Sequence, residues 1–385
     1  MRERRSEMGD SFGTQTVMRT NQQLSDVAET RAPSVHDEVA VEAFRRAHRI
    51  DPDRIRRMRH ALYQGHESVD SALRRLDRHG PSLAAGFLTQ VFEIQERFDS
   101  QIDQSSKWVL KAGDGIRVET VLLRARSGRS AVCISTQAGC RAGCPFCATA
   151  RLGLQRSLTG EEMVEQVLIA GRAARVEGRR VRNVVFMGMG EPLDNEASLH
   201  AAVHTLTDPG RCNYRPRRLL VSTVGVPSAM RRLVDSFPGV QVALSLHSAR
   251  PELREKLVPW TRRHSWEELR DALAYVAAHH RYHRHQGSVM VEHILIDSVN
   301  DGDDDADALI EYLQGIPSHV NLIPHNPVDH APQWRATPRE RRDKFAEKLR
   351  RAGIFTTIRY SMGMDINAAC GQLVAADGRS AEARP

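Results

Sequence analysis

The sequence lacks any uninterrupted apolar stretch near the roughly 18–20 residues that a transmembrane helix needs, so we expect no membrane association. No apolar segment follows the N-terminal MRERRSEMGDSF either, which argues against a secretory signal and favours the cytoplasm. Composition excludes the collagen-like, coiled-coil and disulfide-scaffold classes. With 41% hydrophobic and 27% charged residues, most of the 385-residue chain can build a packed core.

Lysine is also scarce, because the 55 basic Lys and Arg residues include only five lysines, and the formal net charge is +7. The planar fork of arginine binds two phosphate oxygens at once, so a nucleic-acid partner is one explanation of this charge. A biased genomic composition is the other explanation, and charge alone does not decide between them.

Cysteine is limited to six residues, but four of them lie within fifteen positions, and Cys212 and Cys370 stand alone. In a chain of this length without a signal, such a cluster indicates metal binding or catalysis in a reducing compartment rather than a disulfide framework. The clustered residues are Cys133, Cys140, Cys144 and Cys147.

Periodicity divides the chain into unequal parts. Residues 1–38 are polar and without a sustained period, so we predict a disordered tail that carries no core. Apolar residues then recur every three or four positions, LAAGFLTQVFEIQERF at 83–98 included, which predicts a small helical accessory domain over 39–105. A catalytic domain is predicted over 106–375 and a flexible tail over 376–385.

Within the large domain, two predicted strands joined at Ser127-Gly128 are followed by strands that alternate with helices. The first of these helices opens with the capping-box pair Thr159 and Glu162. This order predicts an α/β fold with a parallel sheet curled into a full or partial barrel, whose chemistry gathers at the carboxyl ends of the strands. The predicted strands are 131–136, 181–188, 217–223, 240–247, 289–296, 320–325 and 355–361, and the predicted helices are 161–176, 196–207, 227–236, 266–280, 303–314 and 338–352.

The segment CRAGCPFC has the spacing C-x3-C-x2-C and follows the first of these strands. Three thiolates at Cys140, Cys144 and Cys147 fit one side of an iron–sulfur cube and leave one iron open. The alternative is structural zinc, which needs four ligands, with Cys133 as the only nearby fourth. One crossover later comes MGMGEP, whose glycines allow close backbone approach and whose carboxylate can hold an ammonium group.

The cysteine spacing resembles that of the radical S-adenosylmethionine superfamily. The ordered strings CISTQAGCRAGCPFCATA, FMGMGEPL, VSTVG, SLHS, NLIPHNP and GMDINAACGQL are similar throughout to the RlmN/Cfr family. The resemblance implies a partial (β/α)6 TIM-type barrel with a 4Fe–4S cluster and S-adenosylmethionine. It also implies methylation of an adenine carbon of large-subunit rRNA, and for RlmN-type members of a tRNA adenine as well. Pro192 and Ala138 favour the RlmN type, hence C2 rather than C8, whereas SLHS leans towards Cfr.

The two cysteines outside the cluster that match the family suit this chemistry. An aryl carbon of adenine is electrophilic and is not attacked by a sulfonium methyl, so a protein thiol must first carry the methyl group, and a second thiol must then release the adduct. Cys370 matches the carrier and Cys133 the resolving thiol, although two buried apolar cysteines are the plain alternative. Glu119 matches the general base.

The resemblance also implies contacts and partners. The cofactor-binding positions are Phe146, Gly190, Glu191, Ser222, Ser245, Leu246, His247 and Asn326. We expect a monomer that takes electrons from a flavodoxin or ferredoxin, and an N-terminal domain that binds RNA. A basic loop is a further RNA-contact candidate, with Arg211, Tyr214, Arg215, Arg217 and Arg218. The alternatives are a radical S-adenosylmethionine enzyme for a small molecule or protein, and a zinc-stabilised RNA-binding protein.

Overall fold

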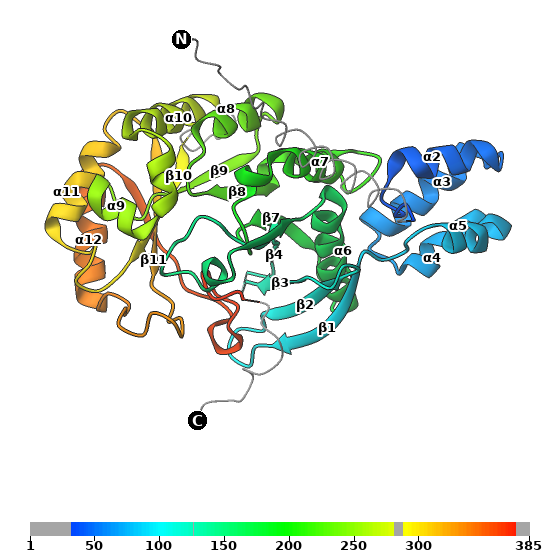
Figure 1. The fold of residues 1–385 in the computed structure, drawn as a ribbon, viewed down its shortest axis with the longest axis horizontal. Helices are drawn as coiled ribbons and strands as arrows, with labels where there is room; N and C mark the ends of the chain where they lie inside the picture. The colour runs from blue at the N-terminus through cyan, green and yellow to red at the C-terminus, as the bar shows by residue number, and fades with distance from the viewer. Residues whose placement is uncertain (1–31, 126, 281–287, 375–385) are drawn as a thin grey trace, which may run out of the picture.

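A ten-stranded sheet forms the body of the described part of the chain, which comprises residues 32–125, 127–280 and 288–374 of a computed structural model (Figure 1). Its first strands form an antiparallel meander, in which the turn at 127–128 joins two strands as predicted. The meander strands are β1 (Phe92–Asp99), β2 (Ser106–Ala112), β3 (Arg117–Arg124) and β4 (Ser130–Cys133).

From β4 onward the sheet is parallel, and within the described residues six β/α units are followed by a last strand. The sheet has two free edges, β1 and β12, so it is a partial barrel with its helices on the outside (Figure 1). These strands are β7 (Val181–Phe186), β8 (Leu219–Thr223), β9 (Gln241–Ser245), β10 (Val289–Leu295), β11 (Ser318–Pro324) and β12 (Phe355–Ile358). The helices are α6 (Gly160–Val176), α7 (Glu196–Thr207), α8 (Pro227–Ser236), α9 (Pro251–Leu257), α10 (Trp266–His279), α11 (Asp303–Tyr312) and α12 (Arg339–Arg351).

The parallel strands form because their apolar residues are buried on both faces of the sheet, as a helix-covered parallel sheet requires. Val184, Val221, Leu244 and Val291 on successive strands have no exposed surface. The register sets polar residues side by side at the carboxyl edge, since Ser245 pairs with Glu292 of the next strand. The sequence therefore builds an apolar centre with a polar rim at one end.

The N-terminal helical lobe lies beside the barrel and packs against helix α6 (Figure 1). A buried His36 Nε2 lies 2.7 Å from Glu165 Oε2 on α6, and Ser34 Oγ donates to Glu161. Residues 34–36 are thus core residues, which corrects the prediction that the whole of 1–38 carries no core; residues 1–31 lie outside the described part. The lobe contains α2 (Glu38–Ala47), α3 (Pro52–Arg59), α4 (Val69–Leu73) and α5 (Gly80–Gly86), with short π- and 3-10 turns at His60–Gln64 and Arg74–His79.

One predicted helix is wrong. Residues 92–98, expected to continue the helical lobe, belong to strand β1, which pairs with β2 along the edge of the sheet. The apolar spacing in FEIQERF suits either structure, and the hydrogen bonds offered by β2 decide in favour of a strand. Ile94 is consequently half exposed on an edge strand rather than packed on a helix face.

A small hairpin and the C-terminal segment complete the carboxyl end of the barrel. Strands β5 (Gln137–Gly139) and β6 (Leu154–Ser157) form the hairpin, and the cysteine segment lies in the connection between them. The last described residues, 359–374, cross the same end (Figure 1). No helix in the described ranges has both the length and the apolarity needed to span a bilayer.

Candidate active site

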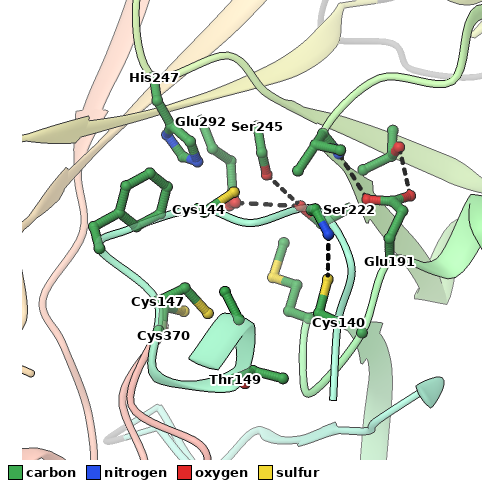
Figure 2. Close-up of a pocket in the computed structure, with 18 of the residues that line it drawn as sticks. Cys140, Cys144, Cys147, Thr149, Glu191, Ser222, Ser245, His247, Glu292 and Cys370 are labelled. Atoms are coloured by element: carbon green, nitrogen blue, oxygen red, sulfur yellow. Dashed lines mark hydrogen bonds between the residues drawn. The ribbon is translucent and has the colours of Figure 1, made fainter. Parts of the chain in front are cut away.

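A cavity opens at the carboxyl ends of β7–β11, with a volume of about 890 Å³ including its mouth (Figure 2). Three cysteines lie on one side, and a row of polar residues from the strand ends lies across from them. Residues expected from the sequence that line it are Cys140, Cys144, Cys147, Phe146, Gly190, Glu191, Ser222, Ser245, His247 and Cys370. These candidate residues therefore gather at the end of the barrel where such folds carry their chemistry.

The cysteine loop is shaped by its hairpin. The Cys140 amide donates to Gly153 O at 3.0 Å across the hairpin, and the Cys147 amide donates to Cys144 O at 3.0 Å within the loop. Burial raises the pKa of the Cys140 thiol to about 12 and also raises the pKa of Cys144 and Cys147. Three thiols grouped in this way, two of them buried and Cys147 partly buried, need a cation to become thiolates.

The glycine-rich segment after β7 packs against β4 and β5. The Gly188 amide donates to Ile134 O at 3.0 Å, and a Cβ on Gly190, whose φ is +98°, would lie 2.5 Å from Gln137 Cβ. Only glycine fits this close approach, which turns the following Glu191 into the cavity. The close approach of the neighbouring chain at Gln137 therefore requires glycine at position 190.

Glu191 is buried and fully hydrogen-bonded. One carboxylate oxygen accepts from Thr223 Oγ1 at 2.7 Å and from the Leu193 amide, and the other accepts from the Val224 amide at 2.8 Å. Burial raises its pKa to about 7, although these bonds favour the charged form. A cationic group in the cavity would complete the charge balance of this carboxylate.

Neighbouring strands contribute a polar row across the floor of the cavity (Figure 2). Ser222 Oγ lies 3.1 Å from Ser245 Oγ and donates to Glu292 Oε2 at 3.4 Å. Glu292 Oε1 is buried without a hydrogen-bond partner, and burial raises the pKa of this carboxyl. Sequence reasoning missed Glu292, although a carboxylate inside the apolar strand VMVEHIL was a signal for it.

His247 and Phe146 form the wall opposite the glycine loop. The His247 Nδ1 accepts from the Ile294 amide at 3.1 Å, and burial lowers the pKa of the ring well below its usual value. The ring is therefore neutral and carries its proton on Nε2, which makes it a donor. Its edge-to-face contact with Phe146, with centroids 5.0 Å apart, fixes the orientation of the ring.

A buried arginine supports the same wall. The Arg254 guanidinium donates to Leu246 O at 3.1 Å and to Val224 O at 2.6 Å, so it ties the segments after β8 and β9 together. Burial lowers its pKa to about 10, and its positive charge favours the thiolate of Cys144. The sequence offered no signal for this residue, because PELREKL resembles an ordinary surface helix.

A second, smaller cavity of about 510 Å³ adjoins the first. Cys133 and Cys370 both line it, and Cys370 lines the first cavity as well. Burial raises the pKa of Cys133 to about 12 and also raises that of Cys370, whereas the Arg359 guanidinium opposes both shifts. Arg359 also lies 3.6 Å from Glu292 Oε1, so a cation links the two thiols to the polar row.

The segment that carries Cys370 is clamped from three sides. Asn326 Nδ2 donates to Cys370 O at 2.9 Å, the Ala148 amide donates to Gly371 O at 2.7 Å, and the Val374 amide donates to Glu119 Oε2 at 3.0 Å. Cys370 is thereby held beside Cys147, whose loop supplies the Ala148 contact. In the structure both Cys133 and Cys370 are free thiols.

Comparison with known proteins accounts for this arrangement. The model of the radical SAM superfamily matches residues 134–313. A probable RNA methyltransferase of Rhodopirellula baltica is 40% identical over 88% of this chain and 87% of its own, and a probable dual-specificity RNA methyltransferase RlmN of a Parafrankia species is 43% identical over 77% and 78%. A crystal structure of a radical SAM methyltransferase from Sphaerobacter thermophilus superposes with a TM-score of 0.84 at 37% identity and covers 89% of this chain and 100% of that one.

The chain belongs to the RlmN/Cfr family. It is a radical S-adenosylmethionine methyltransferase, and membership implies a 4Fe–4S cluster and S-adenosylmethionine. This outcome confirms the family, the barrel and the cofactors expected from the sequence. It also rejects the zinc-stabilised binding protein.

The residues present fit these groups. Cys140, Cys144 and Cys147 would hold the cluster through three thiolates, the ligand type that iron–sulfur clusters take. No group of three or more His, Cys, Asp or Glu in the described ranges converges on one metal-ion position, and ligands of a cube need not converge in this way. The Glu191 carboxylate suits the ammonium group of S-adenosylmethionine. Glu292 Oε1, which faces Arg359 but accepts no hydrogen bond, suits a hydroxyl donor.

Three expected RlmN/Cfr site residues lie elsewhere. The Leu246 side chain is fully buried in the core, so it lines neither cavity. Asn326 holds the Cys370 backbone rather than lining the first cavity. Glu119 lines neither cavity, because Lys107 Nζ lies 3.1 Å from one of its oxygens and the Val374 amide binds the other. Asn326 and Glu119 contact the backbone on either side of Cys370, and a direct role of these three residues in the reaction stays a prediction.

Proposed function

We propose that this enzyme methylates an adenine carbon of large-subunit rRNA, at C2 rather than C8, with Cys370 as the methyl carrier and Cys133 as the resolving thiol. The observation that carries the proposal is the position of Cys370, which lines both the cavity of the cluster cysteines and the cavity that contains Cys133. A carrier must meet a methyl donor on one side and a resolving thiol on the other, and a residue that lines both cavities is suited to this task.

The protein residues have separate tasks in this reaction. Arg359 favours the Cys370 thiolate, which accepts a methyl group by displacement at the sulfonium and becomes S-methylcysteine. When bound, the cluster and S-adenosylmethionine supply the radical chemistry that removes a hydrogen atom from this methyl group. Cys370 then carries a one-carbon bridge to the adenine ring. The ring hydrogen leaves as a proton, and the odd electron of the adduct returns to the proposed flavodoxin or ferredoxin system. The Cys133 thiolate then attacks Cys370 Sγ and forms a disulfide. The bridging C–S bond breaks with its electron pair on carbon, a proton from solvent completes the methyl group, and an external dithiol later reduces the disulfide.

Glu119 is assigned a positioning role in place of the general base expected from the resemblance. Its carboxylate receives the Val374 amide four residues beyond Cys370, and its partner Lys107 donates to Asn367 O at 3.2 Å. The ion pair therefore spans the segment on both sides of the carrier. Loss of Glu119 is expected to loosen this segment before it affects any proton transfer.

The RNA is proposed to approach the carboxyl end of the barrel. Tyr360 lines the second cavity, and its side chain is 82% exposed, so it is available to stack on an unpaired base. A tRNA adenine is proposed as a second substrate, in keeping with relatives that are named dual-specificity RNA methyltransferases. The proposal includes a monomer in the cytoplasm, a flavodoxin or ferredoxin as electron donor, and an RNA-binding role for the N-terminal lobe.

The remaining alternative is a radical S-adenosylmethionine enzyme that acts on a small molecule or a protein. A carrier cysteine distinguishes the two functions, because chemistry that needs no methyl-cysteine has no use for Cys370 at the junction of the cavities. Loss of activity alone does not distinguish them, so the modified product must be identified.

The test is a mass-spectrometric map of modified adenines in rRNA and tRNA from cells with and without this protein. We expect one rRNA adenine to gain a methyl group on C2, and the gain to disappear in Cys370→Ala. Methylation at C8 would contradict the C2 assignment, and unchanged RNA in an enzyme with a full iron complement would contradict the function.

A further inference from the structure

A separate hollow, distinct from both cavities of the active site, lies at the opposite end of the barrel, at the amino ends of β4, β7 and β8. Its volume is about 1580 Å³ including its open mouth, and three turns form its walls: 127–129, 178–182 and 213–218. None of its residues belongs to the two cavities described above. Its distinguishing feature is arginine, with Arg129, Arg179, Arg180, Arg182, Arg215 and Arg218 all on its walls.

Each of the three turns contains a residue whose backbone is in the left-handed region. Gly128 has φ +78° in the β3–β4 hairpin, Gly178 has φ +68° directly after α6, and Asn213 has φ +54° after α7. At the end of α6 the Arg179 amide donates to Ala174 O at 2.8 Å, which is a typical helix-ending bond. The turns are therefore specified by the sequence, and they bring arginines from three separate segments to one place.

The positive charge in the hollow is largely uncompensated. Among the described residues, no Asp or Glu forms an ion pair with five of these arginines, and Arg179 reaches only Glu177, at 3.9 Å. One Arg179 guanidinium nitrogen is buried without a hydrogen-bond partner. Desolvation and the neighbouring arginines lower the pKa of Arg218. Such mutual repulsion costs free energy unless an anion binds.

The loop 211–218 was expected to contact RNA, and the structure changes which of its residues are available. Arg211 is buried and ion-paired with Glu38 and Asp208, and the Tyr214 hydroxyl donates to Val181 O at 3.3 Å. Both are therefore structural residues. Arg215 and Arg218 remain on the hollow, together with four arginines that the sequence pattern did not connect with this loop.

We propose that this arginine hollow binds backbone phosphates of the RNA substrate at a point remote from the modified adenine. The inference rests on the proposed RNA substrate and adds a second site to it. Arginine forks match phosphate oxygens, and phosphate contacts fix the position of an RNA without reading its sequence. A concave site with six arginines from three turns suits a bent or folded backbone.

The position of the hollow predicts which RNA it serves. Strands of five or six residues at about 3.3 Å per residue separate the two ends of the barrel by roughly 17–20 Å. An RNA in contact with both ends must pass along the barrel wall. A large folded RNA can do so, whereas a short oligonucleotide in the catalytic cavity cannot.

The test uses the full chain with reconstituted cluster and the triple variant Arg180→Gln, Arg182→Gln, Arg215→Gln. All three side chains are exposed, and thermal unfolding verifies that the fold is retained. Filter binding is measured with protein-free large-subunit rRNA and with a short adenine-containing oligonucleotide between 50 and 200 mM salt. We expect rRNA binding to weaken about 10- to 100-fold, the salt slope to fall by about 2–3, and oligonucleotide binding to stay the same.

A matched control removes the same charge elsewhere. Arg339→Gln, Lys344→Gln, Arg351→Gln lies on the exposed face of α12, beyond the far strands of the sheet, and is expected to retain rRNA binding. Equal losses of rRNA affinity in both variants would mean that the net charge of the protein, rather than a site in the hollow, determines binding, and would overturn the inference. If the hollow variant keeps rRNA binding but loses the tripolyphosphate binding that the wild type shows, the hollow is a small-anion site and the inference fails. If the wild type methylates RNA while the hollow variant binds it normally, this inference fails and the proposed function stands.

Discussion

Replacement of Gly190 by alanine tests how the cavity wall is built. The new Cβ would lie 2.5 Å from Gln137 Cβ and 2.7 Å from Gln137 N, against the 3.4–4 Å of an ordinary contact. Backbone must therefore move by about 1 Å, and overpacking of this kind costs about 1–3 kcal/mol. Left-handed backbone at φ +98° adds about 1–2 kcal/mol for any residue with a Cβ. We expect Gly190→Ala to lower the free energy of unfolding by about 2–5 kcal/mol.

Gly115 provides the matched control. Its φ is +90°, but a Cβ built there meets no atom within 4 Å, so Gly115→Ala carries the backbone cost of about 1–2 kcal/mol without a clash. Urea unfolding under anaerobic conditions gives the two free energies. Titration with S-adenosylmethionine gives the second readout, because movement of Gly190 also moves the adjoining Glu191.

The two variants must differ in both measurements. We expect the alanine at 190 to be the more destabilised by about 1–3 kcal/mol and to lose cofactor affinity, while the alanine at 115 retains it. Equal destabilisation with unchanged cofactor binding in both variants would refute the close packing of the glycine loop against β5.

Two further predictions concern the same cavity. Replacement of Cys140, Cys144 or Cys147 by alanine should each abolish both the iron complement and turnover, since two thiolates hold a cube poorly; a full iron complement in any single variant would disprove the ligand set. Because the Glu191 carboxyl titrates with a pKa of about 7 and binds an ammonium group only when ionised, cofactor affinity should fall roughly tenfold from pH 8 to pH 6. Glu191→Gln should bind more weakly at both pH values and show no such dependence; an equal pH dependence in this variant would exclude Glu191 as its source.

The parallel part of the fold was predictable from local pattern. Apolar strand segments alternate with amphipathic helices of ordinary length, and the Thr159–Glu162 capping box marks the start of α6 in sequence and structure alike. Strand β1 was not predictable in this way, because its spacing of apolar residues also suits a helix and its state depends on pairing with β2. The docking of His36 depends likewise on Tyr63 and Glu165, which are distant in sequence.

The residues of the site can likewise be separated into those that local sequence pattern predicts and those that depend on distant partners. Cysteine spacing and the glycine turn are local, so the cluster loop and Glu191 were found. Glu292 and Arg254 are buried, and these two residues and Arg359 all act through partners on other segments of the barrel, which only the structure reveals. Leu246 is the reverse case, because its motif position predicts a cofactor contact while its side chain faces the core.

The most direct measurement of the central claim is the intact mass of Cys133→Ala after turnover with RNA and nuclease digestion. If Cys370 carries the methyl group and Cys133 resolves the adduct, this variant should retain its cluster, methylate Cys370 and join the carrier to the adenine. Release should fail because no second thiol can form a disulfide with Cys370. A nuclease-resistant nucleotide adduct on Cys370 is therefore expected, and Cys370→Ala and the double variant should lack it. Normal turnover by Cys133→Ala, or a methylated Cys370 that never traps RNA, would contradict the account.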